Sequence, residues 1–265
     1  MSAMSIPTWG LAVPLLALMA LPLRAMSAPA AMAMAAESAP AAAAPSTPYG
    51  PRYANLQGEV LLDNPRVFVQ KFIVQPGQST GRRTQPGDQL LVFIKGGVLT
   101  SHATGRSTLW REGRVVWHAA ADGVDEGSTN TGSTPIEMIW VTLKPVASPG
   151  AAAPAAAAAP KYRYLNYPNI PGEDLLENDL VIVQRFTVNP GQWEGVHAHH
   201  PDMLYIHIRG GQWAARSNRE PEHAYPSPSP DGEVGWMPTI DIGEGHQSGN
   251  VGKNPIDLIW VTLKK

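Results

Sequence analysis

The sequence contains no cysteine among its 265 residues. This absence excludes disulfide bridges, thiolate metal ligands and cysteine nucleophiles. Charge is also scarce, since Asp, Glu, Lys and Arg make up 16% of the residues and the formal net charge is −2. A chain without a strong field of one sign is not expected to bind nucleic acid. Because no thiolate is present, any metal ion must be held by His, carboxylate, Met or water.

Long apolar runs are almost absent as well. The exception is LAVPLLALMALPL at 11–23, which is followed by Ala-x-Ala sequences. A run of this length fits the core of a signal peptide and is too short to cross a bilayer. No Lys or Arg precedes it, so a misassigned start before a cytoplasmic protein is the alternative. We expect a signal peptide over 1–30, a periplasmic or secreted protein, and no membrane span after signal removal.

Two stretches rich in Ala and Pro divide the remainder. They cover 31–48 and 145–161 and cannot bury a core, so we interpret them as a spacer and a linker. The segments on either side of the linker repeat one another, as VFVQKFIVQPGQ (67–78) matches VIVQRFTVNPGQ (181–192). The repeat predicts two domains of one design, at 49–144 and 162–265.

Each copy consists of short segments rich in β-branched and aromatic residues, separated by Gly, Pro, Asn and Asp. The clearest are VFVQKFIV (67–74), QLLVFIKGG (89–97) and IEMIWVTLK (136–144). Their length and spacing are typical of strands in a small sandwich or barrel. The sequence therefore predicts an all-β fold in which each copy forms one small antiparallel β-barrel.

Histidines gather in the second copy, which contains six of the eight in the chain. His197 and His199 stand two residues apart at the start of an expected strand, where their side chains share one face. His246 follows in a second motif that ends at Asn250. Histidines in such an arrangement are typical ligands of transition metals.

The spacings are those of two motifs of the cupin superfamily, and the second copy resembles that family. The first motif is matched by Gly191, His197, His199 and Gly210, and the second by Gly235, Gly243, His246 and Asn250. Met203 stands where the family has a glutamate ligand, and Asp241 stands where it has a proline. Because both copies share the repeat, the resemblance implies two tandem cupin (jelly-roll) domains.

The resemblance implies that His197, His199 and His246 bind one divalent transition metal, which is Fe, Cu, Zn, Ni or Mn. Met203 is the candidate for a fourth position. In the first copy the four equivalent residues are Arg83, Gln85, Gln89 and Glu126. The first domain is therefore expected to be metal-free.

Strand alternation indicates which further residues line the pocket. If Met203 points into the barrel, Tyr205 and His207 point there as well, while Leu204 and Ile206 face the other way. Tyr205 and His207 are thus candidate catalytic residues that handle a proton. An apolar wall for an aromatic ligand is expected from four residues: Trp193, Trp213, Trp236 and Met237. Asp202 could replace the missing carboxylate only if a bulge turned it inward, and His200 and His223 are expected at the surface.

Three functional hypotheses remain open. The first is an exported, oxygenase-like metalloenzyme that acts on a small, anionic or aromatic molecule, as the resemblance to three-histidine dioxygenases implies. The second is a binding module for a small molecule, a sugar or a metal. The third is a structural protein with a relict site. The expected partner is a small-molecule ligand or substrate, and the barrels could also form a homo-oligomer.

Overall fold

The structure is a computed structural model that describes residues 49–145 and 164–264. The predicted signal peptide, the predicted spacer and most of the predicted linker lie outside these residues, so they stay predictions. The chain divides into Met1–Ala44 and Pro45–Lys265, and both sequence repeats belong to the second unit.

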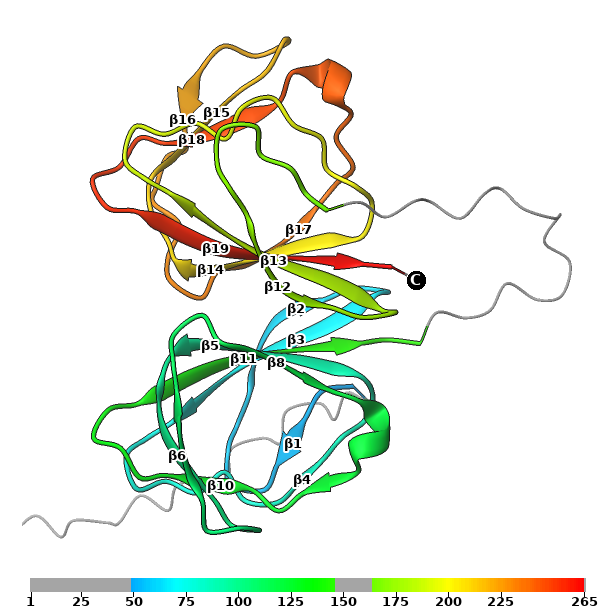
Figure 1. Cartoon of the computed structure of the whole chain (residues 1–265), viewed down its shortest axis with the longest axis vertical. Helices are drawn as coiled ribbons and strands as arrows, with labels where there is room; N and C mark the ends of the chain where they lie inside the picture. Colours follow the sequence, from blue (N-terminus) through cyan, green and yellow to red (C-terminus); the bar gives the residue numbers. More distant parts are fainter. Residues whose placement is uncertain (1–48, 146–163, 265) are drawn as a thin grey trace, which may run out of the picture. The chain divides into compact units, whose positions relative to one another are not determined.

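The first repeat forms strands β1 to β11 around a five-stranded antiparallel sheet in the order β2-β3-β11-β5-β8 (Figure 1). Two three-stranded sheets, β1-β4-β9 and β10-β6-β7, complete this barrel. The strands are β1 (Arg52–Tyr53), β2 (Glu59–Asp63), β3 (Val67–Val74), β4 (Arg83–Thr84), β5 (Gln89–Lys95), β6 (Gly97–Ser101), β7 (Ser107–Trp110), β8 (Val115–His118), β9 (Val124–Asp125), β10 (Ser128–Asn130) and β11 (Ile136–Leu143).

The second repeat forms an equivalent five-stranded sheet in the order β12-β13-β19-β14-β17 and a three-stranded sheet β16-β15-β18. The strands are β12 (Glu173–Glu177), β13 (Val181–Val188), β14 (Met203–Arg209), β15 (Trp213–Arg216), β16 (His223–Ala224), β17 (Val234–Met237), β18 (Gln247–Asn250) and β19 (Ile256–Leu263). Because the two sheet orders match strand for strand, the repeat in sequence is a repeat in structure.

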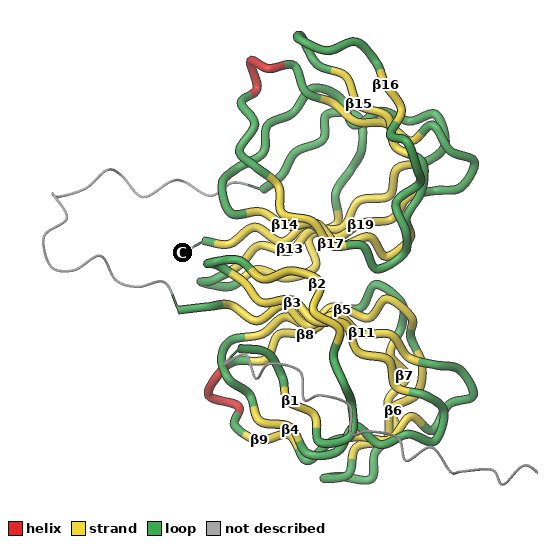
Figure 2. The backbone as a smooth tube through the Cα atoms, turned by 180° about the vertical axis from the view of Figure 1, so that it is seen from behind, coloured by secondary structure: helices red, strands yellow, loops and turns green. Residues whose placement is uncertain are grey.

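The all-β prediction is confirmed. Among the described residues the only helical segments are two three-residue 3-10 turns, η1 (Ala120–Asp122) and η2 (Ile242–Glu244), drawn in red in Figure 2. No helix in the described part of the chain has the length and apolar character needed to span a membrane. The three segments predicted most clearly as strands from the sequence correspond to β3, β5 with the start of β6, and β11.

Both faces of each five-stranded sheet are covered. On β14, Leu204 and Ile206 belong to one buried aliphatic cluster, which contains residues of both repeats. Met203 belongs to another cluster that lies inside the second barrel, with Tyr205 packed against it. Strand alternation thus separates the two faces as predicted, and the inner face of β14 is directed into the barrel.

An asparagine clamps the same turn in both barrels. Asn250 Nδ2 donates to the carbonyl oxygens of Val188 and Asn254, each at 2.8 Å. Asn130 makes the matching bonds to Val74 and Thr134 at 2.8 and 2.9 Å. This asparagine is present in both copies because it fixes the backbone, which the barrel needs with or without a metal.

Candidate metal centre

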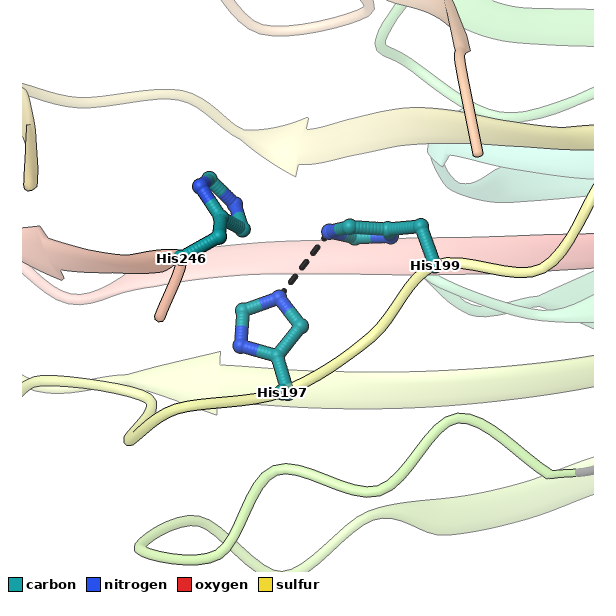
Figure 3. A group of neighbouring side chains, drawn as sticks. All are labelled: His197, His199 and His246. Atoms are coloured by element: carbon teal, nitrogen blue, oxygen red, sulfur yellow. Dashed lines mark hydrogen bonds between the residues drawn. The ribbon is translucent and has the colours of Figure 1, made fainter. Parts of the chain in front are cut away.

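Backbone pairing brings the three predicted histidines together. His197 N donates to the carbonyl of His246 at 3.2 Å, and His199 exchanges two backbone hydrogen bonds with Ile240 at 3.0 and 3.1 Å. These bonds join the segment before β14 to the segment around η2. As a result, one ring nitrogen from each histidine lies within 4.8 Å of the other two (Figure 3).

The ring nitrogens of the three histidines face one another, and their hydrogen bonds indicate which of them could bind an ion. His197 Nδ1 lies 2.9 Å from the Gly195 carbonyl, which can only accept, so Nδ1 carries the proton and Nε2 carries the lone pair. His197 Nε2 is 2.9 Å from His199 Nε2. His246 Nε2 is buried and has no hydrogen-bond partner among the described residues. A buried nitrogen without a partner is costly, and a metal ion would satisfy it, so these residues fit the group.

The three imidazoles are neutral at pH 7. Burial, reinforced by the neighbouring histidines, lowers the pKa of His199 to about 2. Burial lowers the pKa of His197 to about 4, and it lowers the pKa of His246 as well. Neutral imidazole is the form that binds transition metals, so protons do not compete for this site near neutrality.

A carboxyl group that sequence reasoning missed lies beside the cluster. Glu194 is 3% exposed, and its Oε2 lies 3.9 Å from His197 Nε2. This oxygen accepts a hydrogen bond from the backbone N–H of Ser248 at 3.2 Å, and Tyr167 bonds the same carboxyl group. Burial raises the pKa of Glu194 to about 8, so at pH 7 the contact with His197 joins two neutral groups. A divalent ion bound to the histidines would instead lower the pKa of Glu194, since a nearby dication favours the carboxylate form.

Met203 is fully buried in the apolar cluster inside the barrel, and it pairs across the sheet with Met237 and Thr262. Its role as a fourth ligand stays a prediction. Asp202 does not replace the missing carboxylate, because its side chain forms an ion pair with Arg66 at 3.3 Å. Its backbone adopts a left-handed conformation with φ of 58° just before β14.

The histidine cluster opens into a cavity of about 290 Å³. Tyr205 and His207 line it, as strand alternation predicted, and so do Trp213, Trp236 and Met237 of the expected apolar wall. His199 and Glu194 are part of the same wall, which also includes Tyr167, Tyr225, Ser229, Glu233, Ser248, Leu258 and Trp260. A molecule in this cavity would therefore contact His199 of the histidine cluster.

The prediction that Trp193 belongs to the apolar wall is wrong, since this residue does not line the cavity. Its ring lies under the Arg216 guanidinium at 4.0 Å and packs against Gly249, where a Cβ atom would approach within 2.4 Å. The reason is the alternation of extended backbone: Glu194 points into the cavity, so its neighbour points to the opposite side.

His207 reaches the cavity with both ring nitrogens engaged. Trp213 Nε1, which can only donate, bonds His207 Nε2 at 3.1 Å. His207 Nδ1 therefore carries the proton and donates to Glu233 Oε2 at 3.2 Å. The predicted proton carrier thus holds a carboxylate in place, and Glu233 is a second cavity residue that sequence reasoning missed.

The first barrel has an arginine at the equivalent place. Arg83, the counterpart of His197, is 1% exposed and donates from Nη1 to Gln89 Oε1 at 2.7 Å. Its guanidinium lies 4.2 Å from the centre of the Trp140 ring and pairs with Asp125 at 3.5 Å. The other two counterparts are turned to other partners, Gln85 to the Ala119 carbonyl and Glu126 to Arg82. Within the described residues, the first barrel has no cluster of potential metal ligands.

The remaining histidines of the second repeat lie outside the cavity. His223 is exposed on β16, as expected. His200 is half-buried next to the cluster and not fully at the surface as expected.

Comparisons with known proteins establish the fold. The sequence matches no known protein-family profile and no curated protein. The structure is similar to a salicylate 1,2-dioxygenase from Pseudaminobacter salicylatoxidans, with a TM-score of 0.51 and 10% identity over 79% of this chain and 76% of that one. It is also similar to AerE from Microcystis aeruginosa, with a TM-score of 0.50 and 12% identity over 81% and 97% of the two chains.

A third similar structure is a cupin 2 conserved barrel domain protein from Leptotrichia buccalis, with a TM-score of 0.47 and 10% identity over 80% and 91% of the two chains. The chain has a tandem cupin fold. At these identities, the bicupin likeness describes the fold and carries no reaction with it. Within this bicupin, the candidate metal centre lies in the second cupin barrel.

Proposed function

We propose that the second barrel is the catalytic unit of an exported, oxygenase-like metalloenzyme that acts on a small aromatic molecule. His197, His199 and His246 would hold one divalent transition metal, and the substrate would occupy the adjoining cavity. The observation that carries this proposal is the double position of His199, which belongs both to the histidine cluster and to the cavity wall. When bound, such an ion supplies Lewis-acid or redox chemistry next to the cavity.

The residues around the cluster can position a substrate and move a proton. Glu194 lies on the cavity wall beside His197, so its carboxyl group can accept or return a proton of a bound molecule. Ser248 and Tyr167 hold that carboxyl group in one orientation. Trp236 and Trp260 provide flat apolar surface on the same wall and favour a planar ligand.

Aromatic molecules are therefore the first substrates to test. The name of the structural neighbour, a salicylate dioxygenase, points in the same direction. At 10% identity this likeness does not assign its substrate to the present chain, and the argument depends on the aromatic lining of the cavity.

The test is elemental analysis of the protein purified without a histidine tag and offered Fe(II), Cu, Zn, Ni and Mn in turn. We expect about one equivalent of one metal per chain in the natural sequence. The His197→Ala/His199→Ala double variant should lose it. Gln85→Ala is the matched control, because Gln85 is the counterpart of His199 in the first barrel, and it should leave the metal content unchanged.

The metal found would then be used to measure oxygen consumption with a panel of small aromatic substrates. Absence of metal in both the natural sequence and the double variant would make the histidines a relict site. In that case the protein would be a binding or structural bicupin. Loss of metal in Gln85→Ala would contradict the assignment of the site to the second barrel.

A further inference from the structure

The cavity beside the histidine cluster has an unusual charge balance. Its wall contains two carboxyl groups, Glu194 and Glu233, and six Trp or Tyr residues at 167, 205, 213, 225, 236 and 260. Among the described residues that line it, there is no lysine and no arginine. Recognition of a carboxylate or phosphate ordinarily uses Arg or Lys donors. The wall therefore offers an anionic ligand no cationic side chain.

Glu233 is built to remain a carboxylate. His207 Nδ1 donates to its Oε2 at 3.2 Å, and the Ser229 side chain bonds it as well. These bonds hold the pKa of Glu233 below its usual value, with the bond from His207 as the largest cause. The Glu233 side chain is still 33% exposed, so it remains accessible from the cavity.

The charge of Glu233 is not cancelled by its neighbour. Because Trp213 Nε1 donates to His207 Nε2, this imidazole carries its single proton on Nδ1 and is neutral. The hydrogen bonds from Trp213 to His207 and from His207 to Glu233 thus orient the Glu233 carboxylate and leave its negative charge in place. A ligand that brings a positive charge would complete the arrangement.

Aromatic rings connect this carboxylate to the histidine cluster. The ring centres of His199 and Trp260 are 5.0 Å apart, those of Trp260 and Tyr205 are 5.6 Å apart, and those of Tyr205 and His207 are 5.2 Å apart. Aromatic faces stabilise a cation and also cover an apolar body. Glu233 and the histidine cluster are therefore two polar positions with an aromatic wall between them.

Tyr205 keeps its place in this wall because a glycine lies behind it. A Cβ atom at Gly235 would come within 2.3 Å of the Tyr205 hydroxyl oxygen. The bare backbone of β17 thus gives the phenol ring its space. The volume of about 290 Å³ is at the small end of ligand cavities, which limits the ligand to a single small ring or its equivalent.

We propose that this cavity selects a small, ring-bearing amine, whose ammonium group pairs with Glu233 and whose apolar body lies against Tyr205 and Trp236. The inference builds on the proposed function, since it names the substrate class of the same site. It replaces the expectation of an anionic substrate with that of a cationic one. His207 is a positioning residue in this scheme, and Glu233 determines the specificity.

The test compares three probes with one ring and different charge: benzylamine, benzyl alcohol and benzoate. Affinities are measured by titration calorimetry at pH 7 in chelator-treated protein and again in protein loaded with Zn. We expect benzylamine to bind at least tenfold more tightly than either of the other probes. Glu233→Gln should remove this preference by lowering the affinity for benzylamine at least tenfold.

Glu59→Gln is the matched control, because it removes one negative charge from an exposed position on β2 of the first barrel. It should preserve the preference for benzylamine. Thermal melts of each variant verify folding. If Glu233→Gln does not fold, His207→Phe serves as the second variant, because it removes the bond that holds the carboxylate and should reduce the preference.

Three results would overturn the inference. These are tighter binding of benzoate, a preference for benzylamine that persists in Glu233→Gln, and no binding of any probe at millimolar concentration. The measurement in chelator-treated protein does not depend on metal, whereas the proposed function is tested by metal content. Failure of the amine inference can thus be distinguished from failure of the proposed metalloenzyme function.

Discussion

Replacement of Glu194 by glutamine should remove a pH dependence of stability that the metal-free protein otherwise shows. The folded pKa of Glu194 is about 8, above the ordinary value of 4.5. Between these values the folded protein keeps a proton that the unfolded chain releases. The stability that depends on this proton is complete below pH 4.5 and is lost as the pH rises through 8.

The histidines of the cluster change the stability at lower pH than Glu194 does. Burial depresses the pKa of His197 and His199 below 6.5, so they destabilise the metal-free fold only as the pH falls below 6.5. The histidine contribution is common to the natural protein and Glu194→Gln, so the difference between their slopes from pH 6.5 to 8 reports Glu194. One proton corresponds to a slope of about 1.4 kcal/mol per pH unit. Since Glu194 itself begins to ionise near pH 8, the loss over this interval is roughly 1.5 kcal/mol, or about 3–6 °C in Tm.

The assay is thermal unfolding of chelator-treated protein at pH 6.5, 7.0, 7.5 and 8.0. Groups elsewhere in the protein also titrate, so the relevant quantity is the slope of the natural protein minus that of Glu194→Gln. Glu59→Gln, an exposed substitution of the same type, should retain the natural slope. Loading with metal should abolish the difference, because a dication keeps Glu194 ionised. Equal slopes in the natural protein and Glu194→Gln would refute the argument that Glu194 is a buried, protonated acid.

The remaining predictions concern the two barrels separately. His246→Ala should remove most of the bound metal, as measured by elemental analysis. Met203→Glu should retain metal and shift the preference towards harder ions such as Fe(II) and Mn, as competition experiments would show; an unchanged preference would mean that residue 203 does not face the ion. Gly235→Ala should displace Tyr205 and weaken binding of benzylamine and benzyl alcohol alike, since a Cβ atom would lie 2.3 Å from the phenol oxygen. Arg83→Ala should destabilise the protein by about 2–4 kcal/mol in denaturant unfolding and leave the metal content unchanged, because it removes a buried charge from its partners in the first barrel.

The sequence was sufficient to predict the parts of the fold that follow a regular pattern. β3 and β11 could be predicted because each is an eight-residue run rich in β-branched and aromatic side chains, and the repeat supplied the same information twice. The positions of His197, His199 and His246 followed from motif spacing, which fixes where each residue falls relative to the strand ends. The inward direction of Tyr205 and His207 followed from alternation along β14.

The residues that were missed or misplaced lie outside the regular strands. There, the alternation of inward and outward side chains cannot be counted from a strand. Glu194 and Trp193 are neighbours between β13 and β14, and the sequence contains no signal that determines which of them points inward. One signal could have identified Glu194: its counterpart in the first repeat is Thr80, so the carboxyl group occurs only in the copy that has the histidines. Glu233 was missed because its importance depends on a bond from His207, which lies 26 residues away in the chain.

The two barrels place different polar groups at the equivalent position. In the first, the Arg83 guanidinium lies over Trp140 and is stabilised by Gln89 and Asp125. In the second, neutral imidazoles surround the equivalent place, His199 lies against Trp260, and Glu194 provides the carboxyl group.

A buried cation needs acceptors around it, and each barrel has its own set. If the second barrel binds a metal as proposed, Arg83 supplies the equivalent charge in the first barrel, where none of the three histidines has a histidine counterpart. The barrel is unaffected by this exchange because its core and its asparagine clamp are built from other residues. The fold is thus shared by the two copies, whereas the candidate chemistry belongs to the second copy alone.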